Sequence, residues 1–101
     1  MHLLSTILIS LLACHATAWS LTIHFIDGGH ITSNGRLNSG CKAYDLLVGN
    51  RQVDRAEFKG STFADTFELF SDKDCRNLVY RNGGGNHRVQ PPRQVRAYKV
   101  Y

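Results

Sequence analysis

The chain has 101 residues, with 12 Lys and Arg against 8 Asp and Glu, and a formal net charge of +4 at pH 7. This length allows one domain, and 43% hydrophobic with 20% charged residues is the composition of a globular protein rather than of a disordered tail. A multidomain enzyme and a large cofactor-binding fold are therefore excluded.

The N-terminus carries an almost unbroken apolar run over residues 3–14, followed by Ala16-Thr17-Ala18. The run is shorter than the ~20 residues that span a bilayer, and small residues in an A-x-A pattern are typical of a signal-peptidase site. We therefore predict a signal peptide over residues 1–18 and a single secreted β domain over residues 19–101. A buried core helix is the alternative. No second apolar stretch follows, so we expect no membrane anchor in the mature chain.

Cleavage after Ala18 would remove Cys14 and leave Cys41 and Cys75. An even pair in a small secreted domain predicts one disulfide, and two free thiols are the alternative. A bridge closing a loop of this size contributes about 4 kcal/mol in the chain-entropy model.

The mature chain consists of short β segments separated by turn residues. Alternation puts Leu21, Ile23 and Phe25 on one face of a first strand, which Asp27-Gly28-Gly29 ends. Asn34-Gly35 is a typical hairpin dipeptide within the turn-rich residues 32–40. Further strands are expected within residues 41–48, 53–58, 63–70, 78–80 and 95–101, with a loop over residues 82–86.

One segment, residues 58–70, is open to a second interpretation. Ser61 or Thr62 could cap a helix in which Phe63, Phe67 and Phe70 share one face, whereas three Phe and two Thr favour a strand. We expect a loop followed by a strand. Short segments and regular turns then predict an all-β fold, a small Greek-key sandwich.

Two parts of the chain are similar to each other. Residues 52–58 (QVDRAEF) are similar to residues 94–100 (QVRAYKV), and a Phe-x-Asp followed by a Cys precedes each of them. Two Greek-key halves that contribute one Cys each would explain this order. Chance similarity between alternating strands is the alternative.

From Phe67 onward the chain resembles a single βγ-crystallin Greek-key motif. The strand FELF, an acidic turn, the strand LVYR, a Gly-rich bend and the strand QVRAYKV come in the order of that family. The acidic ligands of the family's calcium site are absent before Thr32-Ser33, so the resemblance implies no calcium. The whole chain also resembles small secreted proteins of filamentous fungi, which include host-directed effectors and crystallin-like killer toxins.

Basic residues dominate the C-terminal part of the chain. Residues 76–101 hold six basic residues and no acid, with Tyr80, Tyr98 and Tyr101 between them. Such a surface suits an anionic component of a host or a competitor, and a solvated face is the alternative. The predicted binding surface comprises Arg81, Arg88, Arg93, Arg96, Lys99 and Tyr98, with residues 83–85 as an adjoining loop. Six charges are few for nucleic acid, which we consider an unlikely target.

Catalytic and metal motifs are not found in the sequence. His24 and His30 could converge with Asp27 on a metal, but no free Cys completes a zinc site, so we predict no metal and no cofactor. A ribonuclease would need a base, an acid and an Arg, for which His24, Glu57, His87 and Arg96 are available.

We therefore expect a monomeric, secreted, non-enzymatic protein of the effector type. The alternatives are an antimicrobial or killer-toxin-like protein that acts on membranes and a small secreted ribonuclease.

Overall fold

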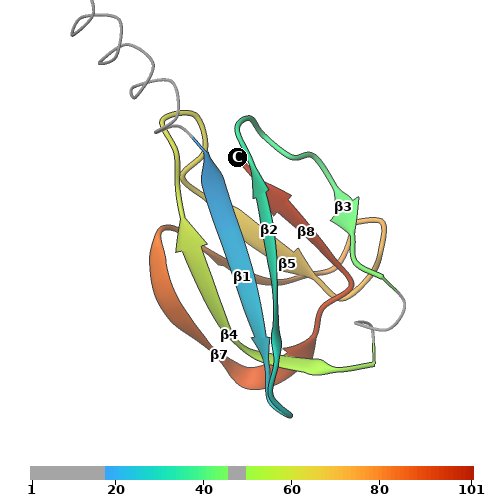
Figure 1. Ribbon diagram of the computed structural model, residues 1–101. Coiled ribbons are helices and arrows are strands. Elements are labelled where there is room, and N and C mark those ends of the chain that lie inside the picture. Colours follow the sequence, from blue (N-terminus) through green and yellow to red (C-terminus); the bar gives the residue numbers. More distant parts are fainter. Residues whose placement is uncertain (1–17, 46–49) are drawn as a thin grey trace, which may run out of the picture.

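A computed structural model describes residues 18–45 and 50–101 of the chain. Within these residues, eight antiparallel strands form two four-stranded sheets packed as a sandwich (Figure 1). Sheet A has the order β2-β1-β4-β7, and sheet B has the order β3-β8-β5-β6. The strands are β1 (Trp19–Phe25), β2 (His30–Gly35), β3 (Lys42–Ala43), β4 (Gln52–Lys59), β5 (Phe67–Phe70), β6 (Leu78–Asn82), β7 (Gly85–Gln94) and β8 (Ala97–Val100). The predicted all-β sandwich is confirmed.

The core lies between the inner faces of the two sheets. β1 alternates buried and half-buried residues along its whole length, so that Leu21 and Ile23 face the core as predicted. Sheet B contributes Phe67, Leu69 and Val100, which are also fully buried. Burying each large apolar side chain stabilises the fold by about 1.5–3 kcal/mol, and no polar or charged residue of the described chain is buried with them.

The first hairpin turns at Asp27-Gly28-Gly29, as expected. Gly28 and Gly29 have φ angles of 97° and 88°, a region that residues with a side chain rarely adopt. The prediction of a hairpin at Asn34-Gly35 is wrong, because both residues lie in β2 and pair with Ser20 and Trp19. Close packing explains this glycine better than a turn does, since a Cβ on Gly35 would lie 2.8 Å from the Trp19 ring.

Three expected strands are shorter than predicted. Of residues 63–70 only Phe67–Phe70 form β5, and Phe63 is 64% exposed, so the helical alternative is wrong. Of the expected strand over residues 41–48, residues 46–48 lie outside the described chain, and within residues 41–45 the strand is Lys42–Ala43, β3. Of residues 95–101 only Ala97–Val100 form β8. No helix long and apolar enough to cross a membrane occurs in residues 18–45 and 50–101.

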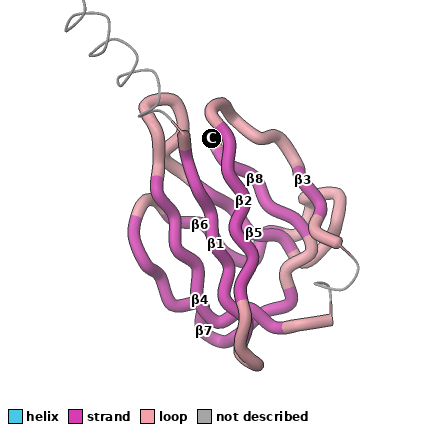
Figure 2. Tube along the Cα trace, viewed as in Figure 1, coloured by secondary structure: helices cyan, strands magenta, loops and turns pink. Residues whose placement is uncertain are grey.

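The longest strand, β7, was not predicted. Residues 85 and 86, expected in a loop, begin it, and Pro91-Pro92 lie inside it rather than in a connection to the last strand. β7 is an edge strand, which tolerates proline because one side of its backbone needs no partner. Its register against β4 shifts between Arg88 and Arg93, and this irregularity takes up both prolines. Figure 2 shows β7 running beside β4.

The strand order has an internal symmetry. Adding four to each strand number of sheet A, and continuing from β8 to β1, converts β2-β1-β4-β7 into β6-β5-β8-β3, which is sheet B read backwards. Each sheet therefore takes three strands from one half of the chain and one from the other. The two similar segments fit this symmetry: residues 52–58 lie in β4, and residues 94–100 contain β8, the strand that the symmetry makes equivalent to β4. Val53 and Val95, which correspond in the two segments, are both fully buried.

The predicted disulfide is present. Cys41, just before β3, is bonded to Cys75, in the connection between β5 and β6, with the two Cα atoms 5.9 Å apart. β3 contributes only Lys42 and Ala43 to its pairing with β8. The disulfide therefore fixes a short edge strand that has few backbone hydrogen bonds of its own.

Candidate ligand-binding face

The six residues of the predicted basic surface do not gather on one face. Arg88 lies on β7 of sheet A, whereas Arg81 and Lys99 lie on β6 and β8 of sheet B. Arg93 is near the end of β7, and Arg96 is in the connection to β8. Since outward side chains of the two sheets point in opposite directions, these cations are divided between the two sides of the sandwich.

On sheet B the cations surround an acidic residue. Glu68 on β5 pairs in register with Lys99 and lies 3.8 Å from the Arg81 guanidinium. The Tyr101 hydroxyl also donates a hydrogen bond of 3.0 Å to this carboxylate. Glu68 offsets part of the positive charge here, which leaves this face a weaker site for an anion.

Tyr98 is partly buried and packs against the core. Its ring centroid lies 6.3 Å from that of Trp19 and 5.2 Å from that of Tyr44. Trp19 is buried and donates its indole N–H to the carbonyl of Leu37. We conclude that Tyr98 packs the two sheets together and is only partly available to a ligand.

The outer face of sheet A carries the densest group of polar side chains. Alternation that buries Leu21 and Ile23 turns Ser20, Thr22 and His24 of β1 outward. Direct pairing then aligns His24 with His30 on β2 and with Arg55 on β4, and Arg55 with Arg88 on β7. These four residues, His30, His24, Arg55 and Arg88, form what we call the cationic row, which crosses all four strands.

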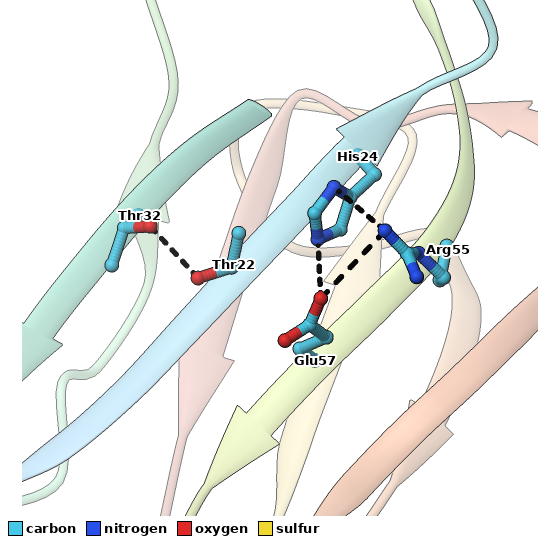
Figure 3. A network of polar contacts seen from close by, with 5 residues as sticks. All are labelled: Thr22, His24, Thr32, Arg55 and Glu57. Carbon is cyan, nitrogen blue, oxygen red and sulfur yellow. Dashed lines mark hydrogen bonds and ion pairs between the residues drawn. The ribbon is translucent and has the colours of Figure 1, made fainter. Parts of the chain in front are cut away.

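Contacts at the centre of the cationic row are close (Figure 3). His24 Nε2 lies 2.7 Å from Glu57 Oε1, and His24 Nδ1 lies 3.2 Å from Arg55 Nη2. Arg55 also approaches Glu57 Oε1 to 3.8 Å. The ring centroids of His24 and His30 are 5.5 Å apart.

These distances determine the tautomer of His24. A guanidinium only donates hydrogen bonds, so Nδ1 must accept the one from Arg55 and carries no proton. The ring proton is then on Nε2, which donates to the Glu57 carboxylate. With this tautomer both contacts are satisfied together, Arg55 on one side of the His24 ring and Glu57 on the other.

A second row runs beside the cationic row and carries hydroxyl and amide groups. Thr22 pairs with Thr32 on β2 and with Glu57 on β4, and Glu57 pairs with Asn86 on β7. The two threonine Oγ1 atoms are 2.8 Å apart (Figure 3). A hollow of about 370 Å³ lies over Thr22, Glu57 and Asn86, and another of about 420 Å³ lies over His24, Arg55 and Arg88. Both are open depressions in a sheet surface.

Arg51 closes one end of this face. Its guanidinium lies 2.8 Å from Asp27 and 3.9 Å from the centre of the Phe25 ring. The hydrogen bond from Arg51 lowers the pKa of Asp27 below its usual value. Asp27 is thus engaged in the hairpin by Arg51, and not with His24 and His30, the alternative that the sequence had left open. No group of three His, Cys, Asp or Glu suited to a metal is found among the described residues.

Of the four residues considered for a ribonuclease, the structure brings together only two, His24 and Glu57. The ring of His87 lies 5.9 Å from that of Phe67, and its Nε2 lies 2.8 Å from the carbonyl oxygen of Gly83. Arg96 belongs to the connection into sheet B. Arg55 was not predicted as a site residue, because only the register of β4 against β1 shows that it lies beside His24.

Comparison with protein-family models, with curated proteins and with solved structures found no match for this chain.

Proposed function

We propose that this is a small secreted protein of the effector type, which acts without catalysis by binding an anionic component of a host or a competitor. The cationic row supports this most strongly, since it places two Arg and two His side by side on an open sheet surface. Open, flat surfaces suit the binding of extended partners, whereas small substrates are usually held in enclosed pockets.

Export is supported by several features that fit together. The apolar run and the A-x-A pattern end at Ala18, and β1 begins at Trp19. Cleavage at this position would leave every described strand complete. The Cys41–Cys75 disulfide is of a kind that forms and persists in oxidising compartments.

A Greek-key fold of the βγ-crystallin type is part of the proposal. Its support is the strand order, in which β3 and β7 are exchanged between two otherwise equivalent halves. The sequence pattern from Phe67 onward and the similarity of residues 52–58 to residues 94–100 point the same way. A solved structure in which these two strands remain with their own halves would contradict it.

Binding to defined surfaces tests the function. The mature, oxidised protein should sediment with vesicles of anionic lipid or with acidic polysaccharide, and binding should fall as salt is raised, because exposed charges are screened. Replacing Arg55 and Arg88 by Glu should abolish binding, whereas the matched exchange of Arg81 and Lys99 should have a smaller effect. The proposal would be refuted if the protein bound neutral and anionic surfaces equally, or if it bound neither.

The same protein preparation can be used to test two other functions, membrane attack and RNA cleavage. Membrane attack of the killer-toxin kind would release dye from anionic vesicles, while binding alone would not. The 2.7 Å contact of His24 with Glu57 specifically favours the ribonuclease as a second candidate, since a base held by a carboxylate can take a proton from a ribose hydroxyl. RNA cleavage that is lost in His24→Gln and Glu57→Gln would support this second candidate.

A further inference from the structure

We propose that the outer face of sheet A binds a linear acidic polysaccharide through its uronate carboxylates, and that protonation of His24 releases Arg55 to strengthen this binding as pH falls. This inference rests on the proposed function and names the ligand class and the regulation of the same face.

The cationic row runs across the strands of sheet A. Its four residues lie on four neighbouring strands, which are about 4.8 Å apart, so the row extends over roughly 14 Å across the sheet. A single small anion would use only part of such a row. An extended polymer that carries one charge on each unit can contact its whole length.

The face carries groups that suit both the carboxylates and the hydroxyls of an acidic sugar. Arg55 and Arg88 present planar guanidinium groups that pair with carboxylates through two parallel hydrogen bonds. The second row offers Thr22, Thr32 and Asn86, whose hydroxyl and amide groups match sugar hydroxyls. A ligand with both charges and many hydroxyls fits this pair of rows better than a ligand with charges alone.

A single-stranded nucleic acid fits this face less well than a polysaccharide does. Single strands are held by stacking of their bases on aromatic rings as well as by cations. Among the described strands of sheet A, the residues that alternation turns outward include no Trp, Tyr or Phe. The aromatic rings turned outward there are the imidazoles of His24 and His30, which offer bases less stacking area than Trp, Tyr or Phe, so the face favours the polysaccharide.

The pH dependence follows from the tautomer of His24. Its Nδ1 accepts a hydrogen bond from Arg55, and a proton added at Nδ1 would turn that acceptor into a donor. Two donors cannot share this contact, so Arg55 is freed for a ligand carboxylate. Histidine is the side chain that gains charge between pH 8 and pH 5.

Other charged groups around His24 also affect the binding of an anion, the cations by strengthening it and the acids by weakening it. His30 on β2 lies beside His24, with the ring centroids 5.5 Å apart, and Arg55 and Arg88 are cations throughout. Glu57 attracts the protonated ring and restrains Arg55 at 3.8 Å, and Asp54 lines the same hollow. A proton on His24 would thus give the cationic row three cations, against the two acids Glu57 and Asp54.

A titration of the mature, oxidised protein with a galacturonate oligosaccharide at constant ionic strength tests this inference. We expect binding about tenfold tighter at pH 5 than at pH 7.5, because protonated His24 adds one charge and releases Arg55, and each exposed ion pair is worth a few-fold in affinity. The sugar carboxylates remain ionised at both pH values, since simple carboxyl groups titrate near ~4. The methyl-esterified oligosaccharide should not bind.

Variants assign the effect to residues. His24→Gln with His30→Gln should bind equally at both pH values, and Arg55→Gln with Arg88→Gln should lose about tenfold or more at either pH. Arg81→Gln with Lys99→Gln is the matched control on sheet B and should bind like the wild type. An unchanged thermal midpoint in each variant shows that the fold is intact.

The contradicting outcomes are distinct. If the protein binds anionic vesicles but the galacturonate oligosaccharide no better than its ester, the ligand class is wrong while the proposed function stands. If single-stranded RNA binds more tightly than the oligosaccharide, the argument from stacking is wrong. Binding that is equal at pH 5 and pH 7.5 in the wild type refutes the role of His24, and failure with every anion refutes the proposed function itself.

Discussion

His24 and Glu57 lie on neighbouring strands but not directly opposite each other. The residues opposite His24 and Glu57 across the β1–β4 pair are Arg55 and Thr22, respectively, so the 2.7 Å contact between the His24 ring and the Glu57 carboxylate is a diagonal one. Long side chains reach such diagonal neighbours across an antiparallel pair. The diagonal contact leaves the other nitrogen of the ring to Arg55, and this division determines how the face responds to protons.

The position of the ring proton is the first prediction. Nitrogen NMR at pH 8 should show that neutral His24 carries its proton on Nε2, because Nδ1 accepts from Arg55. In Arg55→Gln this preference should weaken, whereas Arg81→Gln should leave it unchanged. A neutral ring protonated on Nδ1 would contradict the arrangement of the cationic row.

A second prediction concerns the packing of β2 on β1. In Gly35→Ala the new Cβ would lie 2.8 Å from the buried Trp19 ring, which is closer than real side chains approach. Overpacking of this kind costs about 1–3 kcal/mol, to be measured as the free energy of unfolding in urea together with a shift in tryptophan fluorescence.

Gly84→Ala is the matched control for this change. The nearest atom to its new Cβ is 3.7 Å away, an ordinary contact, so stability should be nearly unchanged. Equal stability of both variants would mean that Gly35 does not pack on Trp19.

The disulfide provides a third prediction. Replacing Cys41 and Cys75 together by Ser should lower the free energy of unfolding by about 2–5 kcal/mol, since the bridge restricts the unfolded chain. A reductant should destabilise the wild type to the same extent and leave the double variant unaffected. Wild-type protein that is insensitive to reductant would show that the bridge contributes little.

Acid sensitivity provides a fourth prediction, centred on Asp72. Its carboxylate accepts hydrogen bonds from the backbone N–H groups of Asn77 and Arg76, at 2.9 and 3.0 Å, and these bonds lower its pKa. A carboxyl group whose pKa is lower in the folded state stabilises the fold above its unfolded pKa of about 3.9. That contribution is lost as the pH falls through the lower, folded value.

Unfolding midpoints measured between pH 7 and pH 2 test this linkage. Asp72→Asn should be less stable than the wild type at pH 7, and the difference should narrow below about pH 4. Asp74→Asn, an exposed change in the same turn, serves as the control. A constant difference between Asp72→Asn and the wild type over the whole range would show that the carboxylate charge is not involved.

The sequence predicts β1 but not β7, and the difference lies in the residues of the two strands. The alternation of Leu21, Ile23 and Phe25 identifies β1 because apolar residues at every second position bury one face of a strand. β7 carries glycine at its start and Pro91-Pro92 within it, which are signals for loops. Only its place at the edge of sheet A, which is a tertiary property, explains why it forms a strand.

The candidate face was predicted only in part. Arg88 was expected at a binding surface and lies on the outer face of sheet A. Arg81 was expected at the same surface and is only seven positions earlier in the sequence, but it lies on β6 and belongs to sheet B. Closeness in sequence therefore did not imply a shared surface. His24 and Arg55 are 31 positions apart and meet through the pairing of β1 with β4, which no local pattern reveals.

Chemical-shift mapping of the isotope-labelled, oxidised protein with the galacturonate oligosaccharide at pH 5 tests the central claim most directly. We predict that the largest changes fall on His30, His24, Arg55 and Arg88, and that the outer face of sheet B changes little. Changes concentrated on Arg81 and Lys99, or spread without preference over both sheets, would contradict a ligand-binding face on sheet A.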